Sequence, residues 1–243
     1  MTIDKQKREN QVLEAVIHTH IDTALPVSSN YIARILGLSS ATIRNVMFDL
    51  ESQGCLYHPH TSAGRIPTDL GYRRYVDNIK AREIEAISEN LCSRIKNHLH
   101  KLEILEDIIE EASRVISEVT NYTAVAISPR EKLYLDGAYH MFEQPEFREF
   151  EKMRVFLRVM EEKKDLLNIL RDDLDYLGTK IRIGREIELD GLEHCTVITT
   201  SYKVKNRPAG NLGVIGPMRM KYEKIVPLVE EIASLATEML EKI

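Results

Sequence analysis

Residues 28–67 contain the feature that most limits the fold: two short helical patterns joined by a tight turn and followed by a turn-rich segment. Serine pairs at 28–29 and 39–40 can cap the two helices, because a serine hydroxyl accepts a hydrogen bond from an unpaired N–H of the first turn. Gly37 and Gly54 can end them, since glycine readily adopts the left-handed conformation common after a helix. The short turn at Gly37 is typical of a helix-turn-helix.

A further helix before this unit and a hairpin after it complete the N-terminal pattern. Apolar residues recur at helical spacing over 5–22, and Pro26 stops that helix. After Gly54, "CLYHPH" alternates like a strand, "TSAG" has turn chemistry and "RIP" is a short return strand. The side chains expected to face the core from the two short helices are Tyr31, Ile32, Ile35, Leu36, Ile43, Val46, Met47 and Leu50. Three helices and a two-stranded flap predict a winged helix-turn-helix over 1–80.

The third helix opens with polar residues, which predicts a surface that reads a duplex rather than one that fills the core. Hydroxyl, guanidinium and amide groups there can meet base edges and phosphates, and the N–H groups of a first helical turn favour a phosphate. The glycine-bearing flap turn can approach a sugar-phosphate backbone closely. Each feature alone is usually a cap or a solvated side chain, but their combination favours DNA binding. The candidate DNA-binding residues are Ser39, Ser40, Thr42, Arg44, Asn45, Thr61, Ser62, Arg65 and Arg73.

The rest of the chain predicts a helical linker over 81–120 and a second domain over 121–243. Apolar residues in the linker are spaced by three and four, which fits a helix or helical hairpin that dimerises or docks on the second domain. That domain alternates strand-like runs such as "YTAVAIS" and "HCTVITTSYKV" with helical stretches, and it ends in an amphipathic helix. We therefore expect an α+β fold with an antiparallel sheet covered by helices.

Composition excludes several classes of protein. The 243 residues are 43 % hydrophobic with a net charge of −5; the first 80 residues carry +1 and the remainder −6, a weak bias that suits a DNA-binding head on an acidic body. No apolar run approaches the roughly 18 residues of a membrane span. The N-terminus lacks the apolar stretch of a secretory signal, and three widely spaced cysteines indicate neither a disulfide framework nor a thiolate zinc site. We expect a cytoplasmic location.

No set of residues predicts catalysis or a cofactor. The run "GNLGVIG" lacks the lysine and Ser/Thr of a phosphate-binding loop, so a strand bend or close packing explains it better. The histidine pairs His18 and His20, and His58 and His60, have no set of carboxylate and cysteine ligands at metal-binding spacing beside them, which argues against a metal site. No nucleophile, base and orienting group emerge together, so we expect no enzyme activity.

The stretch "LSSATIRN…DLESQGCLYHPHTSAGRIPTDLGYRRYVD" resembles the N-terminal domain of the heat-inducible transcription repressor HrcA family. Two further stretches are similar to later parts of that family, "QPEFREFEKMRVFLRVMEEKKDLL" and "SYKVKNRPAGNLGVIGPMRMKYEKIVPLV". The resemblance implies a repressor of chaperone operons that binds an inverted-repeat operator, CIRCE, as a homodimer. It also implies that the chaperonin GroEL assists the active form, and that the second domain is GAF-like.

The chain departs from the family in two places. The residues between "YTAVAIS" and "FEQPEF", 129–141, are too few for the dimerising region that the family inserts there, so the chain resembles a shortened form. Val46, Met47 and Phe48 replace a Glu-Met-Ala-like run in the third helix, which affects packing or base preference.

Two other functions remain compatible with the sequence. A winged-helix regulator of other genes would be controlled by a small molecule in the second domain, although no convergent polar pocket is legible. A scaffold would use the winged helix to bind protein, although the polar face over 39–45 and Arg65 argue against it.

Overall fold

The chain forms two compact units, Met1–Glu83 and Ile84–Ile243. The computed structural model describes residues 2–60, 64–80, 87–100, 102–174, 176 and 178–242. Helices and an antiparallel sheet occur together, which confirms the predicted α+β class.

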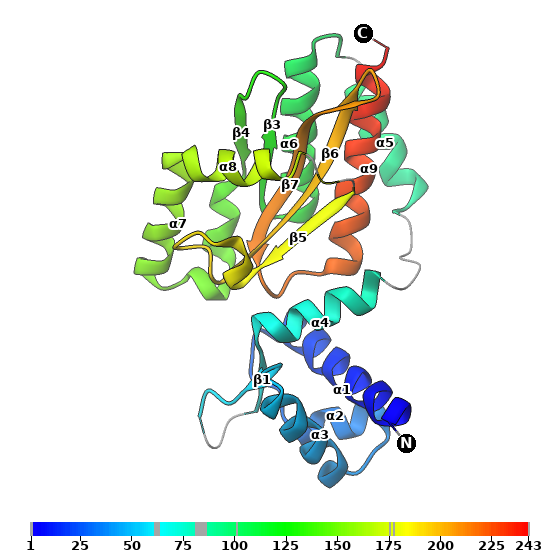
Figure 1. Cartoon of the computed structure of the whole chain (residues 1–243), viewed down its shortest axis with the longest axis vertical. Helices are drawn as coiled ribbons and strands as arrows, with labels where there is room; N and C mark the ends of the chain where they lie inside the picture. Colours follow the sequence, from blue (N-terminus) through cyan, green and yellow to red (C-terminus); the bar gives the residue numbers. More distant parts are fainter. Residues whose placement is uncertain are drawn as a thin grey trace. The chain divides into compact units, whose positions relative to one another are not determined.

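The first unit combines helices with a short strand pair (Figure 1). Its elements are α1 (Thr2–Thr23), α2 (Ser29–Leu36), α3 (Ser40–Ser52), β1 (Leu56–Tyr57), β2 (Ile66–Pro67) and α4 (Asp69–Lys80). The two strands pair antiparallel, with Leu56 opposite Pro67. Val27 extends this pairing through two backbone hydrogen bonds of 2.9 Å to Arg65.

The turn between α2 and α3 follows the local chemistry that the sequence predicts. Ser28 caps α2 by accepting a hydrogen bond from the N–H of Tyr31. Gly37 ends that helix with φ +64°, and Ser39 then caps α3 by accepting from the N–H of Thr42. Because these caps satisfy donors that a helix terminus leaves unpaired, both helices begin where their serines stand.

The core of the first unit lies between α1 and the helices α2, α3 and α4 that pack on it. The side chains buried there are Val12, Leu13, Val16, Ile17, Ile21, Ile32, Ile43, Met47, Leu50, Tyr72, Tyr75, Val76 and Ile79. Tyr31 and Ile35, which were expected to face inward, are 44 % and 53 % exposed. The reason is that α2 is only eight residues long and buries just Ile32 and Ala33. Its apolar face is therefore wider than the area that neighbouring elements cover.

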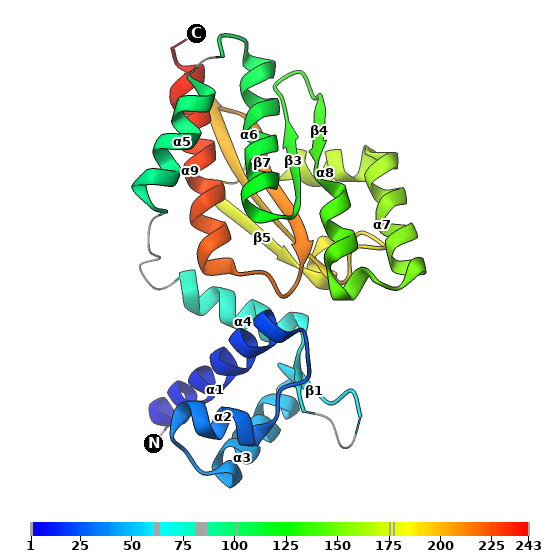
Figure 2. The same ribbon diagram turned by 180° about the vertical axis from the view of Figure 1, so that it is seen from behind.

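The helices predicted over 81–120 dock within the second unit, which is one of the two arrangements that their apolar spacing predicted. They are α5 (Glu89–Leu99) and α6 (Leu105–Thr120). The longer α6 buries Ile108, Ile109 and Ile116 against the sheet and against α9 (Tyr222–Leu240), while α5 packs on α9 (Figure 2). The apolar face of α6 therefore packs against other elements of the same chain.

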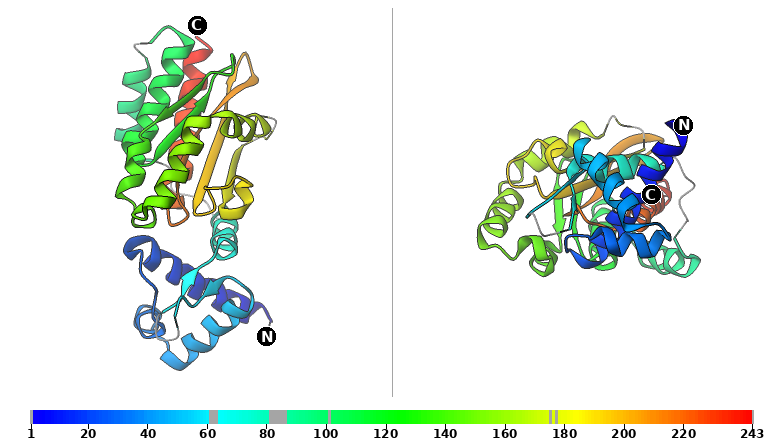
Figure 3. Two further views of the ribbon diagram at one scale, coloured as in Figure 1. Left: turned by 90° about the vertical axis from the view of Figure 1, so that its left-hand side faces the viewer. Right: turned by 90° about the horizontal axis from the view of Figure 1, so that it is seen from below.

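The second unit is built on an antiparallel sheet whose strand order is β4-β3-β7-β6-β5. The strands are β3 (Thr123–Ile127), β4 (Leu133–Asp136), β5 (Thr179–Ile183), β6 (Cys195–Val204) and β7 (Arg207–Pro217). The remaining elements are η1 (Ala138–Glu143), η2 (Pro145–Phe147), α7 (Phe150–Glu162), α8 (Lys164–Asp172) and η3 (Gly184–Ile187). Figure 3 shows the strands and these helices from the side.

Helices cover both faces of this sheet. Val197 on β6 packs in a core cluster with Phe156 of α7 and Leu170 of α8. Its neighbour Thr196 lies 2.8 Å from the hydroxyl of Tyr222 on α9. Consecutive strand residues point to opposite faces, so α7 and α8 cover one face while α6 and α9 cover the other.

The glycine-rich run "GNLGVIG" lies in the long central strand β7, which the sequence indicated only as a short apolar run. A Cβ placed on Gly213 would come within 2.2 Å of the carbonyl oxygen of Ile198 on β6. Only a residue without a side chain fits there, so close packing explains this glycine.

Candidate nucleic-acid interface

The first turn of α3 presents an ordered group of hydroxyls. The Oγ of exposed Ser39 accepts a hydrogen bond from the N–H of Thr42 at 3.0 Å and lies 2.8 Å from the Oγ1 of Thr42. Ser40 donates its hydroxyl hydrogen bond to Asn30 of α2. The cap therefore holds Ser39 and Thr42 together, while Ser40 ties α3 to α2, a contact that the sequence analysis did not foresee.

Arg44 and Asn45 lie on the exposed face of α3, one turn further along. Within the described part of the chain, neither side chain has an ion-pair or hydrogen-bond partner. Phe48 follows them by four and three residues, which places it on the same face, and it is 63 % exposed. This face thus offers a guanidinium, an amide and an aromatic ring to a partner.

Arg65 does not lie on the surface where the sequence analysis placed it. Its side chain is 9 % exposed, and its guanidinium bonds Glu51 of α3 through Nε at 3.1 Å and through NH2 at 3.0 Å. NH1 lies 3.9 Å from the sulfur of Met47. The interpretation of Arg65 as an exposed phosphate contact is therefore wrong, because the base of the flap folds onto the C-terminal half of α3 and encloses the guanidinium.

Glu51 joins both ends of the flap base to α3. Its Oε1 lies 2.7 Å from Nδ1 of His58, beyond β1, while Oε2 takes Arg65 from the other side. Burial would raise the pKa of Glu51, but the hydrogen bonds from His58 and Arg65 outweigh burial and hold that pKa below its ordinary value. His58 is accordingly a partner of a carboxylate in a position set by the hairpin.

The arginines of α4 also have partners inside the first unit. Arg73 lies 3.3 Å from Asp77 one turn later, and its side chain is 23 % exposed. Arg74, the neighbour of Arg73, donates to Asn10 of α1 and to Gln53 beyond α3. Arg74 therefore fastens three helices together.

The remaining flap candidates, Thr61 and Ser62, lie outside the described residues.

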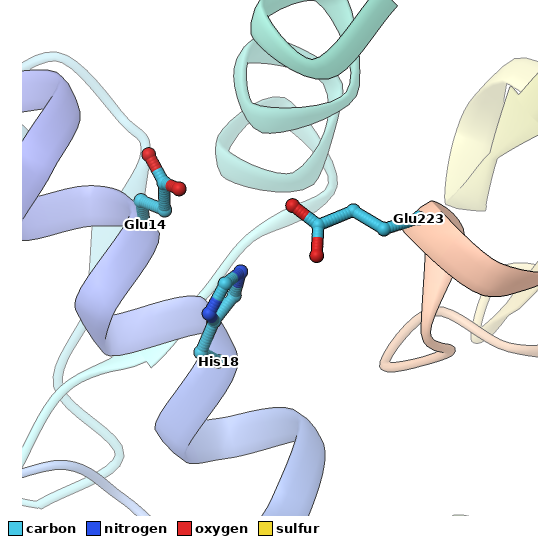
Figure 4. A group of neighbouring side chains, drawn as sticks. All are labelled: Glu14, His18 and Glu223. Carbon is cyan, nitrogen blue, oxygen red and sulfur yellow. The ribbon is translucent and has the colours of Figure 1, made fainter. Parts of the chain in front are cut away.

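The histidines of α1 are explained by packing. His18 Nε2 lies 2.8 Å from the hydroxyl of Tyr75, and His20 Nδ1 lies 2.8 Å from that of Tyr72, so both hold α4 against α1. Figure 4 shows His18 one turn after Glu14 on α1; Glu223, also drawn, belongs to α9 of the second unit.

Comparison with known sequences identifies the family. The chain is 31 % identical to the heat-inducible transcription repressor HrcA of Symbiobacterium thermophilum, in an alignment that covers 96 % of this chain and 98 % of that protein. The chain belongs to the HrcA family. The HrcA of Pelotomaculum thermopropionicum is 29 % identical, with 97 % of each chain covered. The profile of the HrcA protein C terminal domain matches residues 126–226.

The alignments also show that the chain is a shortened member of the HrcA family. The alignment with the Symbiobacterium protein runs over 335 positions, more than the 243 residues present here. Since nearly all of both proteins is aligned, a substantial stretch of the relative stands opposite gaps in this chain. That the missing stretch is the inserted region expected between 129 and 141 stays a prediction.

The HrcA family consists of transcription repressors and not of enzymes, so the chain belongs to a class that acts by binding DNA. A crystal structure of a hypothetical protein shares the fold, with a TM-score of 0.80, 20 % identity and coverage of 97 % of both chains. In the described part of the chain, no helix combines the length and apolar character that crossing a membrane requires.

Sequence reasoning missed three residues of this surface. Glu51 gave no signal, because its partners His58 and Arg65 approach through the hairpin. Asn30 gave no signal either, because it lies in the first turn of α2, ten residues before the Ser40 hydroxyl that donates to it. Phe48 was noticed as unusual, and its spacing of four from Arg44 was the available sign that both share a face.

Proposed function

We propose that the first unit is a winged helix-turn-helix whose α3 enters the major groove of a chaperone-operon operator. The exposed Arg44 and Asn45, which have no partner among the described residues, carry this proposal. An arginine can bind guanine and an asparagine can bind adenine, each through two hydrogen bonds. The support helix α2, the turn at Gly37 and the β1–β2 pair stand in the order of that motif.

The contacts to the DNA backbone come from the start of α3 and from the flap. Ser39, Thr42 and the first N–H groups of α3 bind a phosphate, which fixes the register of the helix in the groove. Thr61, Ser62 and Arg73 add further phosphate contacts. Arg65 acts indirectly by holding the flap base on Glu51.

The repressor acts as a homodimer on an inverted repeat, because two copies of the head match two half-sites. The second unit, a GAF-like sheet with helices, contributes regulation and dimerisation. The chaperonin GroEL modulates the active form. These statements rest on the resemblance to the HrcA family and on the match over residues 126–226.

A gel-shift experiment on the promoter of the host's own chaperone operon tests the proposal. We expect retardation of the inverted repeat at submicromolar protein and none of a scrambled repeat, with affinity falling steeply as salt rises, since each phosphate contact adds roughly one unit to the log–log slope. Addition of chaperonin should increase the active fraction. Equal retardation of the repeat and the scrambled duplex would contradict specific binding, and no effect of chaperonin would remove GroEL from the proposal.

A further inference from the structure

We propose that Phe48 reads a thymine methyl group in the operator, as a specificity-determining residue of α3. The inference deepens the proposed function and rests on it. Phe48 is 63 % exposed, whereas its neighbour Met47 is fully buried, so the ring faces away from the core of the first unit. Isolated exposed apolar residues are common, and exposure alone would mean little.

The position of Phe48 on the helix gives its exposure a meaning. It lies one turn after Arg44 and Asn45 on the same face. Side chains on an α-helix lean toward the N-terminus, so the ring lies over the turn that carries these two residues. A duplex that contacts Arg44 and Asn45 through its major groove therefore covers Phe48 as well.

The chemistry of the ring selects its partner within the groove. A phenyl group donates and accepts no conventional hydrogen bond, so it gains nothing from the donors and acceptors on guanine, cytosine or adenine edges. The C5-methyl of thymine is the one apolar group that a base pair presents in the major groove. Contact between ring and methyl removes both from water, and burying about one methyl group corresponds to roughly fourfold in affinity.

The test replaces each thymine of the chaperone-promoter repeat by deoxyuridine, which deletes only the C5-methyl. Binding of each duplex is measured by fluorescence anisotropy for the wild-type chain, Phe48→Ala and Phe48→Leu. We expect roughly a fourfold loss at one or two symmetry-related positions for the wild type, most of it retained in Phe48→Leu and none of it in Phe48→Ala. Phe150→Ala, which removes a phenylalanine 77 % exposed on α7, is the matched control and should keep the full penalty.

The outcomes separate this inference from the function on which it rests. If the wild type binds the repeat but no thymine shows a methyl penalty, or if Phe48→Ala keeps the penalty, the role of Phe48 is wrong and the repressor remains. If the wild type retards no duplex, the proposed function falls and this inference falls with it. Thermal unfolding of Phe48→Ala should match the wild type, because the ring contributes little to the core.

Discussion

The arginines at the two ends of α3 differ in exposure and in bonding partners. Near its start, Arg44 is exposed and has no partner among the described residues. Near its end, Glu51 takes the guanidinium of Arg65, which is 9 % exposed. Both arginines looked alike in the sequence as cations of a DNA-binding head. The difference teaches that the start of the helix leaves its cation exposed, whereas its end holds the base of the flap in place.

The largest effect is expected from breaking the enclosed pair. Glu51→Ala leaves the Arg65 guanidinium buried without its carboxylate, and we expect a loss of about 3 kcal/mol in the free energy of unfolding, at the lower end for buried pairs because Glu51 is itself 30 % exposed. Urea unfolding measures it. The control Glu118→Ala removes one of the two carboxylates paired with Arg114 on the surface of α6 and should cost less than about 0.5 kcal/mol. Equal losses in the two variants would refute the structural role of Arg65.

A smaller effect is expected at the start of α3, and it should appear in DNA binding and not in stability. Arg44→Ala should reduce discrimination between the operator and a mutated half-site by about 1–3 kcal/mol, since the proposed contact of Arg44 with a base would have two hydrogen bonds, while the unfolding transition stays in place. Competition gel shifts measure the discrimination. Arg154→Ala, an exposed arginine of α7, is the control and should leave it unchanged. Loss of stability without loss of discrimination in Arg44→Ala would reverse the comparison.

The N-cap at the start of α3 should have a still smaller effect. Ser39→Ala removes the acceptor for the N–H of Thr42, and we expect about 1 kcal/mol less stability, as is usual for a serine N-cap. Ser52→Ala at the other end of α3 removes only a hydroxyl bonded to the carbonyl of Phe48 and should be nearly neutral. Thermal unfolding of both variants decides whether the start of α3 depends on its cap.

The smallest effect is one of pH. The folded-state pKa of Glu51 lies below its ordinary value of 4.5, so its pairing stabilises the fold at neutral pH and is lost as pH falls through that range. The stability difference between wild type and Glu51→Gln should therefore shrink between pH 6 and pH 3. Urea unfolding at a series of pH values measures the difference. A gap that stays constant or widens on acidification would show that the carboxylate charge does not support the flap.

Much of the first unit follows from local patterns. The caps at Ser28 and Ser39, the turn at Gly37 and the buried face of α1 depend on residues close in sequence, so spacing and turn chemistry predicted them. The exposure of Tyr31 and Ile35 could not be predicted in this way. It depends on how little of α2 its neighbours cover, and helical period alone says nothing about the width of a contact.

The sequence by itself determined the class of this protein, the order of its helices and strands, and the exposed polar start of α3, because these depend on capping, periodicity and short motifs. Only the tertiary structure decided that α5 and α6 join the second unit, that β7 is a central strand, and that Arg65 is enclosed by Glu51. Each of these depends on residues far apart in the chain meeting in space. An arginine is available to bind DNA only if the rest of the fold leaves its guanidinium exposed. An arginine that the fold encloses stabilises the structure instead.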